Sequence, residues 1–430
     1  MSSETNTEKK GIWRALWREL GVPVGAILLA LLIGAVILLI SGANPILAYS
    51  ALFNGAFGGA SNIGRTLEKA TPLIFNGLAI SLAFKAGMFN IGAQGQLVFG
   101  AIVSAFIGFA VKGLPWFIHA PFALICGTLA GALYGAIPGV LKAYTGASEV
   151  IITIMLNYIA LNMTDWLVGG PWQDKSTEIL LPRTPSILDT AHINMNRLID
   201  TGIIYVVLGL YAIGLGFWAY TKIKPMVKEG TWGWNRFLSK YSQTLLMLVI
   251  PLILIGLYIL HFLQIGFIIA VSAAFFIWWL LQKTTIGFEI RMVGANSHAA
   301  RYAGIKVAFI IILTLVISGA LAGLGGAVET TGVDGRFEPA FNVGLGFDGI
   351  TISLLAKTHP LGNIPAALLI GAMKAGSNEM QFEASVPKEI IDVIQGLMLF
   401  FVAADVLVRY ILRIRSSETK ISLTSGWGEH

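Results

Sequence analysis

Residues 285–305 read TIGFEIRMVGANSHAARYAGI, a segment with three charged side chains, three glycines and four alanines. It lies between two long apolar runs, 242–282 and 308–328. A membrane-spanning helix needs about 20 apolar residues, so these runs predict spans and the segment predicts a polar loop between them. Its own pattern predicts two short helices hinged at Gly294, with charged side chains presented to a partner and Ala299, Ala300 and Ala303 packing closely.

The composition of the whole chain fits a membrane protein. Of its 430 residues 56% are hydrophobic and only 12% are charged, and the mean hydropathy is +0.76. A soluble domain carries about twice that charge. The net charge of +6 comes from Lys and Arg at the edges of apolar runs, where basic residues fix orientation. It therefore indicates topology and not a nucleic-acid partner.

Apolar runs and their basic flanks predict about 10 to 12 crossings in an all-α bundle. Residues 1–21 form a cytoplasmic N-terminal segment, 22–413 the transmembrane domain and 414–430 a cytoplasmic tail. Both termini are therefore expected inside the cell. The expected spans are 22–41, 66–84, 93–111, 117–141, 149–169, 201–221, a hairpin over 242–282, 308–328, the short pieces 345–356 and 360–376, and 389–411.

Two polar loops separate some of these spans, and one region is an apparent insertion. Residues 170–200 mix acidic and basic side chains and predict an extracellular loop. Residues 201–262 contain an apparent extra hairpin with a basic loop that includes Trp232 and Trp234. Residues 283–307 are polar and basic, which places them in the cytoplasm.

Two glycine-rich stretches, 86–96 and 344–349, combine apolar surroundings with polar side chains. Backbone that leaves the helix at membrane depth is tolerated only beside protein or a water-filled cavity, so such pairs of broken helices indicate a transport pathway. The side chains predicted to bind substrate there or on the next span are Asn90, Gln94, Gln96, Asn157, Phe347 and Asp348.

Each of these assignments has a structural alternative. The stretch 90–96 is equally read as a cytoplasmic turn between two spans, and Asp348 as a helix cap or a partner for Lys357. Asn157 suits an interhelical hydrogen bond about as well as a pathway. Gly127, Gly131, Gly135 and Gly139 recur every four residues and predict close helix packing.

The segment 285–305 also resembles a known family. It matches the cytoplasmic coupling segment of ABC-type sugar and nucleoside permeases, in which T-x-x-G-x-x-x-R-x-x-G-x-N precedes A-A-x-x-x-G-I. Residues 84–97 and 146–158 resemble the nucleoside branch, and 346–350 with 361–363 match more loosely. The resemblance covers about 65–170 and 280–410, and it departs from the family between 201 and 262.

The resemblance implies a helical bundle of the vitamin B12 importer type (a type II importer) that translocates nucleosides or simple sugars. It implies three partners: an ABC ATPase, a substrate-binding lipoprotein, and a second permease subunit, identical or homologous. The chain has no G-x-x-x-x-G-K-[ST] motif, so ATP and Mg²⁺ belong to the ATPase and the chain itself is no enzyme. The residues expected to couple to that ATPase are Glu289, Arg291, Gly294, Asn296, Ala300, Arg301 and Gly304.

Two other functions compete. An ion-coupled secondary transporter also uses broken helices, but it needs buried ionisable residues in its spans, and few stand there. A membrane enzyme would use His261, His298 or His359, which lack acid or metal partners nearby in the sequence. Neither function explains the segment 285–305.

Overall fold

The computed structural model describes residues 21, 23–176, 181–193, 211, 214, 221–224, 264–338, 344–387 and 389–404. This part of the chain is helical and contains no strand. In chain order its elements are an apolar helix Pro23–Ile40, α2 (Pro45–Phe57), α3 (Ala60–Lys85), α4 (Ala93–Ala110), α5 (Trp116–Thr145), α6 (Glu149–Gly169), α10 (Ile265–Lys283), α11 (Thr285–Ala295), α12 (Ser297–Tyr302), α13 (Val307–Glu329), a π-helical turn Thr330–Asp334, α14 (Leu345–Leu355), a 3-10 turn Pro360–Gly362, α15 (Asn363–Ala384) and α16 (Glu389–Ala403).

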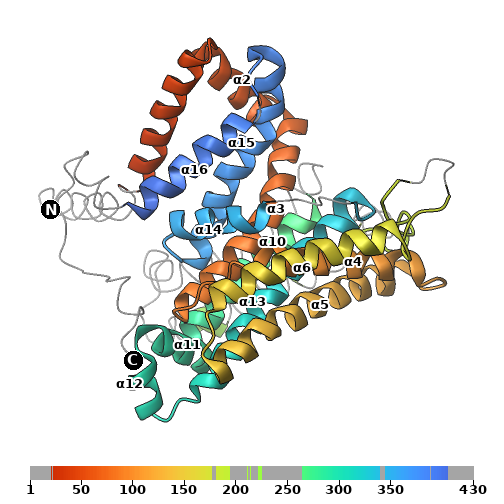
Figure 1. Ribbon diagram of the computed structural model, residues 1–430, viewed down its shortest axis with the longest axis vertical. Coiled ribbons are helices and arrows are strands. Elements are labelled where there is room, and N and C mark those ends of the chain that lie inside the picture. Colours follow the sequence, from red (N-terminus) through yellow and green to blue (C-terminus); the bar gives the residue numbers. More distant parts are fainter. Residues whose placement is uncertain are drawn as a thin grey trace, which may run out of the picture.

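The helices form two groups that meet on α3 (Figure 1). In one group α4, α5, α6 and α13 run side by side, and α13 packs extensively on α5 and α4. In the other group α2, α15 and α16 lie with the helix Pro23–Ile40. Since α3 contacts α13, α14 and α15, it holds the two groups together.

Six helices of the described residues are long and apolar enough to cross a membrane: Pro23–Ile40, α4, α5, α6, α10 and the stretch Val307–Asp334. The predicted all-α polytopic membrane bundle with broken helices is thus confirmed. The predicted spans 22–41, 93–111, 117–141, 149–169 and 308–328 coincide with five of these helices. Most of the predicted extra hairpin at 201–262 lies outside the described residues.

The contact between α5 and α13 is made by glycines. A Cβ atom on Gly131 would overlap the carbonyl oxygen of Gly319, and one on Gly135 would lie 2.5 Å from that of Leu315. A Cβ atom on Gly127 would lie 2.7 Å from the carbonyl oxygen of Gly100 on α4. The expected small-residue packing is therefore present, and only glycine lets these backbones approach so closely.

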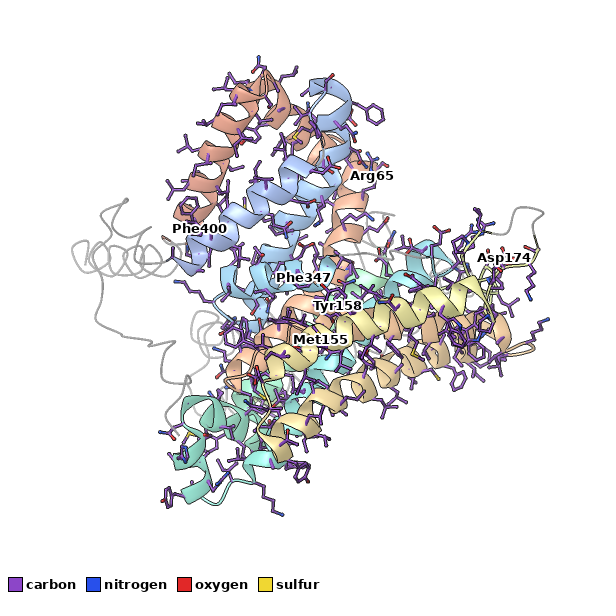
Figure 2. All side chains as sticks on the ribbon, in the orientation of Figure 1. Arg65, Met155, Tyr158, Asp174, Phe347 and Phe400 are labelled. Carbon is purple, nitrogen blue, oxygen red and sulfur yellow. The ribbon has the colours of Figure 1, made fainter. Side chains whose placement is uncertain are left out.

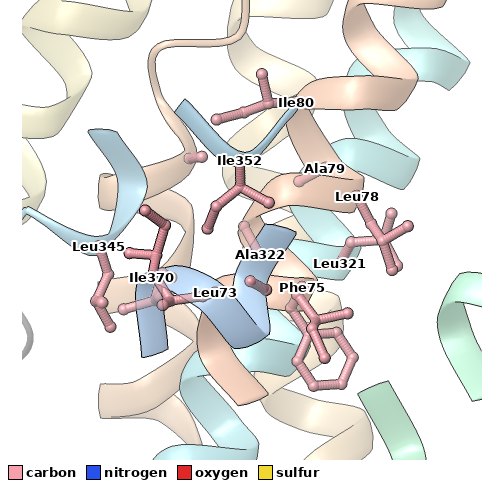
Figure 3. Packing of buried hydrophobic residues seen from close by; sticks show 14 of the residues in the cluster. Leu73, Phe75, Leu78, Ala79, Ile80, Leu321, Ala322, Leu345, Ile352 and Ile370 are labelled. Carbon is pink, nitrogen blue, oxygen red and sulfur yellow. The ribbon is translucent and has the colours of Figure 1, made fainter. Parts of the chain in front are cut away.

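The buried core gathers around the middle of α3. Figure 3 shows Leu73, Phe75, Leu78 and Ile80 of this helix against side chains of α13, α14 and α15. Phe75, Leu78 and Ile80 have no exposed surface. Because α3 is buried all round in this region, it serves as the fixed axis against which shorter helices are placed.

The second half contains the break that the sequence predicted between 345–356 and 360–376. Helix α14 ends at Leu355, and α15 begins only at Asn363. Between them Lys357 and Thr358 have φ values of 51° and 56°, in the left-handed region that residues with a Cβ rarely adopt. A continuous helix is impossible there.

At the end of the bundle remote from α11 and α12, the loop residues 181–193 pack on the segment that follows α13 (Figure 1). The backbone N–H of Thr184 donates to the carbonyl of Phe337 at 2.9 Å, and that of Ile187 to Gly335 at 2.8 Å. Nearby, hydrogen bonds from the Ser176 hydroxyl and backbone N–H lower the pKa of the Asp174 carboxyl. At this end the described loop residues are therefore tied to one another by backbone hydrogen bonds.

Candidate functional site

The segment 285–305 folds into two short helices, α11 and α12, that project from one end of the bundle (Figure 1). The Thr284 hydroxyl accepts from the backbone N–H of Gly287 at 3.1 Å and starts α11. The Asn296 side chain accepts from the N–H of Ala299 at 3.0 Å and starts α12. Both are N-caps, which satisfy donors that the first helical turn leaves free.

The predicted hinge at Gly294 is wrong by two residues. Gly294 lies inside α11, whereas Asn296 has extended backbone angles (φ −162°, ψ 108°) and separates the helices. The physical reason is the capping preference of asparagine, which competes with helix continuation. Gly294 has another role, because a Cβ there would overlap the Lys85 carbonyl oxygen and lie 2.9 Å from the Gly87 nitrogen.

The coupling segment shows a mixed outer surface. Phe288 is 52% exposed and Tyr302 93% exposed, and Asn296, Arg301 and Gly304 are also exposed. Glu289 and Arg291 are half-buried, and Ala300 is buried. The close packing predicted for the alanines holds for Ala300 alone, since Ala299 and Ala303 face outward. An exposed tyrosine and phenylalanine beside an arginine are typical of a surface that another protein covers.

The turn 86–92, between α3 and α4, lies against α11. Gly87 has φ +72°, and the backbone N–H groups of Met88 and Gly87 donate to the carbonyls of Ala83 and Phe84, both at 3.0 Å. This is the Schellman arrangement that ends a helix at a glycine. The alternative interpretation of this stretch, a turn between two spans, therefore describes its backbone.

The side chains of Asn90 and Gln96 fix this turn. Asn90 donates to the Gln96 amide oxygen at 2.8 Å and to the Ser318 hydroxyl at 2.7 Å, and its oxygen accepts from the N–H of Gly92 at 3.1 Å. Ser318 in turn donates to the carbonyl of Ala79 on α3. All three side chains are buried, so the network ties the turn to α3, α4 and α13.

Asn157 and Gln94 cap the broken helices from a neighbouring element. Asn157 on α6 accepts from the N–H of Gly95, in the first turn of α4, at 2.8 Å and donates to the carbonyl of Ile91 at 2.9 Å. Gln94 accepts from the N–H of Gly346, in the first turn of α14, at 2.8 Å. Each amide satisfies a backbone donor that would otherwise lie buried without a partner.

Helix α14 carries two of the predicted site residues: Asp348 forms an ion pair, and Phe347 is exposed. Asp348 lies 3.0 Å from the Lys374 ammonium of α15 and accepts from Gln395 of α16, and Lys374 also lies 3.6 Å from Asp392. The suggested partner Lys357 is thus replaced by Lys374. Phe347 is 50% exposed.

Helix α6 carries a row of exposed side chains, and Figure 2 draws two of them, Met155 and Tyr158, in the same part of the view as Phe347. Tyr158 is 62% exposed and Met155 51% exposed, and Asn162 and Asp165 follow on the same helical face. We call Met155, Tyr158, Asn162, Asp165 and Phe347 the pathway face. An acidic side chain within an apolar span is costly against lipid, so this face meets protein or water.

Sequence reasoning missed Ser318, Lys374 and Gln395, although each forms a hydrogen bond or an ion pair with a predicted site residue. Ser318 stands in an apolar run where a hydroxyl carries little signal, and its partner Asn90 is 228 residues away. Lys374 was the better clue, because a lysine inside an apolar stretch demands an acidic partner.

An all-α bundle with broken helices and several helices able to cross a membrane is the architecture of a polytopic membrane permease. The family model described as "Branched-chain amino acid transport system / permease component" matches residues 62–403, and the chain belongs to this family. It is accordingly a multi-pass transport subunit of an ABC transporter without enzymatic activity of its own.

Three relatives align along nearly the whole chain. A guanosine ABC transporter permease of Bacillus subtilis is 36% identical over 91% of this chain and 95% of its own length. A nucleoside ABC transporter permease of Lactococcus lactis is 34% identical (92% and 93%), and a glucose ABC transporter permease of Haloferax volcanii 28% identical (92% and 90%). No solved structure matches the chain significantly.

Proposed function

We propose that this permease imports nucleosides, or related simple sugars, with ATP and Mg²⁺ bound and hydrolysed in a separate subunit. The names of the relatives supply the substrate class, and the two most similar of the three act on guanosine or nucleosides. The observation that carries the mechanism is the projecting pair α11 and α12, whose outer surface exposes Phe288, Arg301 and Tyr302.

The pathway face supports a route for such a solute. Phe347 and Tyr158 offer half-exposed aromatic rings, and rings of this kind stack on a nucleobase or a sugar face. Phe89 adds a third ring, 39% exposed, with its centroid 4.9 Å from that of Phe84. Asn162 and Asp165 add polar groups beside them. We assign substrate contact to Phe347 first.

The amide candidates have a different part in this proposal. The polar groups of Asn90, Gln94, Gln96 and Asn157 make hydrogen bonds within the protein, and Asp348 forms an ion pair. Each of these side chains pairs with a backbone group, another amide or a charge that would otherwise lie without a partner in the bundle interior. We therefore propose that they position the pathway and that the aromatic rings contact the solute.

The partners follow from the same surfaces. The ATPase binds α11 and α12 on the cytoplasmic side, and a second permease, identical or homologous, covers the pathway face. A substrate-binding lipoprotein delivers the solute at the opposite end, where residues 181–193 are hydrogen-bonded to the segment that follows α13. We further propose that the bundle lies in the plasma membrane with both termini in the cytoplasm.

The test is uptake by the whole importer in proteoliposomes. We expect radiolabelled nucleosides to accumulate with ATP and not with a non-hydrolysable analogue, and Arg291→Ala to reduce that uptake. A complex that accumulates another solute class but no nucleoside overturns the substrate assignment. Uptake driven by a proton or sodium gradient without ATP overturns the mechanism in favour of an ion-coupled transporter.

A further inference from the structure

We infer that Gln94 is a positioning residue which, together with the contact of Gly294 on Gly87, transmits movement of α11 to α14 and hence to Phe347. This inference rests on the proposed function and adds a route between the coupling segment and the pathway face. Three contacts, each between neighbouring elements, make up the route.

The first contact joins α11 to the turn 86–92 through backbone alone. A Cβ on Gly294 would lie 2.9 Å from both the Ala86 carbonyl carbon and the Gly87 nitrogen, and one on Gly87 would lie 3.3 Å from the Gly294 Cα. No flexible side chain separates these two backbones. A displacement of α11 toward the bundle therefore displaces the turn.

The second contact joins the turn to α4. Asn90, in the turn, and Gln96, in the first turns of α4, form two hydrogen bonds between their amides, of 2.8 Å and 3.3 Å. The Asn90 oxygen also holds the N–H of Gly92, the residue before α4. The turn and the start of α4, where Gln94 lies, consequently move as one unit.

The third contact joins α4 to α14. The Gln94 oxygen accepts from the N–H of Gly346 at 2.8 Å, and a Cβ on Gly346 would lie 2.6 Å from the Gln94 Cα. Phe347, half-exposed on the pathway face, follows Gly346 directly. The end of this chain of contacts is therefore the ring to which we assign substrate contact.

Helix α14 is built to be displaced as a unit. Left-handed backbone stands before it at Gly344 (φ 95°) and after it at Lys357 and Thr358. The short rigid helix is thus separated from its neighbours in sequence at both ends. Elements of this kind absorb a rotation in their flanking residues.

A buried polar group on α3, packed against α14, is consistent with a second position of α14. Asn76 on α3 is fully buried, and its amide nitrogen and oxygen have no partner among the described residues. A Cβ placed on Gly349 of α14 would lie 2.9 Å from the Cβ of Asn76. An unpaired buried amide raises the free energy of this arrangement.

The first experiment measures coupling in proteoliposomes that contain the whole importer. Nucleoside taken up per ATP hydrolysed is compared for the wild type, Gln94→Leu, Gly294→Ala and the control Gly64→Ala, whose Cβ meets nothing within 4 Å. We expect Gln94→Leu and Gly294→Ala to lower this ratio about tenfold, a typical coupling effect, while hydrolysis continues. Gly64→Ala should keep the ratio close to that of the wild type.

The result that overturns the relay is an unchanged ratio in both Gln94→Leu and Gly294→Ala. A proportional loss of uptake and hydrolysis also overturns it, because such a loss shows a structural role only. A wild-type complex that hydrolyses ATP without moving nucleoside overturns the proposed substrate instead.

The second experiment follows α14 without any substrate. Phe347→Cys is placed in a Cys126→Ser background, which removes the chain's single cysteine. Its maleimide labelling rate is measured in the whole importer with and without trapped nucleotide. We expect nucleotide to change the rate, and we expect Gln94→Leu to abolish that change. A nucleotide-dependent rate that survives Gln94→Leu overturns the relay, whatever solute the importer carries.

Discussion

The contact between α5 and α13 and the junction around 86–96 are both rich in glycine, but they are held in opposite ways. Gly131, Gly135 and Gly319 bring two continuous helices into backbone contact, and no polar side chain takes part in it. At the junction helices end, and the amides of Asn90, Gln94 and Asn157 satisfy the freed backbone. Interlocked packing resists displacement, whereas hydrogen bonds can exchange partners. The first region is therefore a rigid frame and the second the place where the permease can move.

The largest effect is expected from Gly131→Leu, which disrupts the frame. The new side chain would overlap the backbone of α13 and force the helices apart, at a cost above about 3 kcal/mol. The yield of monodisperse detergent-solubilised protein and its melting temperature are the measurements. Gly64→Leu is the control, since the space beside Gly64 is open. Equal stability of the two variants would refute the rigid frame.

Next in size is Lys374→Met, which leaves the Asp348 carboxylate without its cation. The Asp348 side chain is only 13% exposed, so we expect a loss of about 3 kcal/mol in the free energy of unfolding. The double variant Asp348→Asn with Lys374→Met should recover most of it, because no charge remains buried. If the double variant is as unstable as the single one, the ion pair is not what Lys374 provides.

A smaller loss is expected from Asn157→Leu at the junction. It deprives the Gly95 N–H and the Ile91 carbonyl of their partners, at about 2 kcal/mol. Asn162→Leu on the same helix is the matched control, because Asn162 is exposed and donates to the carbonyl of Tyr158 within α6. Melting temperatures compare the two variants. A drop of the same size in both would mean that Asn157 is no cap.

The smallest expected change in free energy is that of Phe347→Ala, and it should affect transport while leaving stability unchanged. Losing one ring that stacks on the solute costs about 1 kcal/mol, or roughly a fivefold higher KM for nucleoside uptake. Phe382→Ala on α15 is the control, because that ring is 84% exposed and stands on another helix than the residues of the pathway face. An unchanged KM would remove Phe347 from the solute path.

Much of the frame was predictable because it depends on patterns that lie within one helix. The apolar lengths located α4, α5, α6 and α13, and the four-residue spacing from Gly127 to Gly139 predicted the close packing. The polar residues that follow α14 also predicted that the chain leaves the helix before α15 begins. Length, hydrophobicity and glycine spacing are local properties, so a single sequence shows them directly.

The junction was predictable only in part because its partners are remote in sequence. Asn90, Gln94 and Asn157 were recognised as unusual polar residues in apolar surroundings, but their partners were not. Gly346 lies 252 residues from Gln94, and nothing in the local pattern shows that one caps the other. The sequence did not predict the hinge at Asn296, because glycine and a capping asparagine both favour a break between helices and the segment contains both.

The central claim is that α11 and α12 connect this bundle to an ATP-hydrolysing subunit. The direct measurement is photocrosslinking in the assembled importer from a cysteine-attached reagent at Tyr302, which is 93% exposed, in the Cys126→Ser background. The same reagent at Ile40, 82% exposed on an apolar helix, is the control. We predict that Tyr302→Cys captures the ATPase subunit and that Ile40→Cys does not. Failure of Tyr302→Cys to capture it in an importer that hydrolyses ATP would contradict this claim.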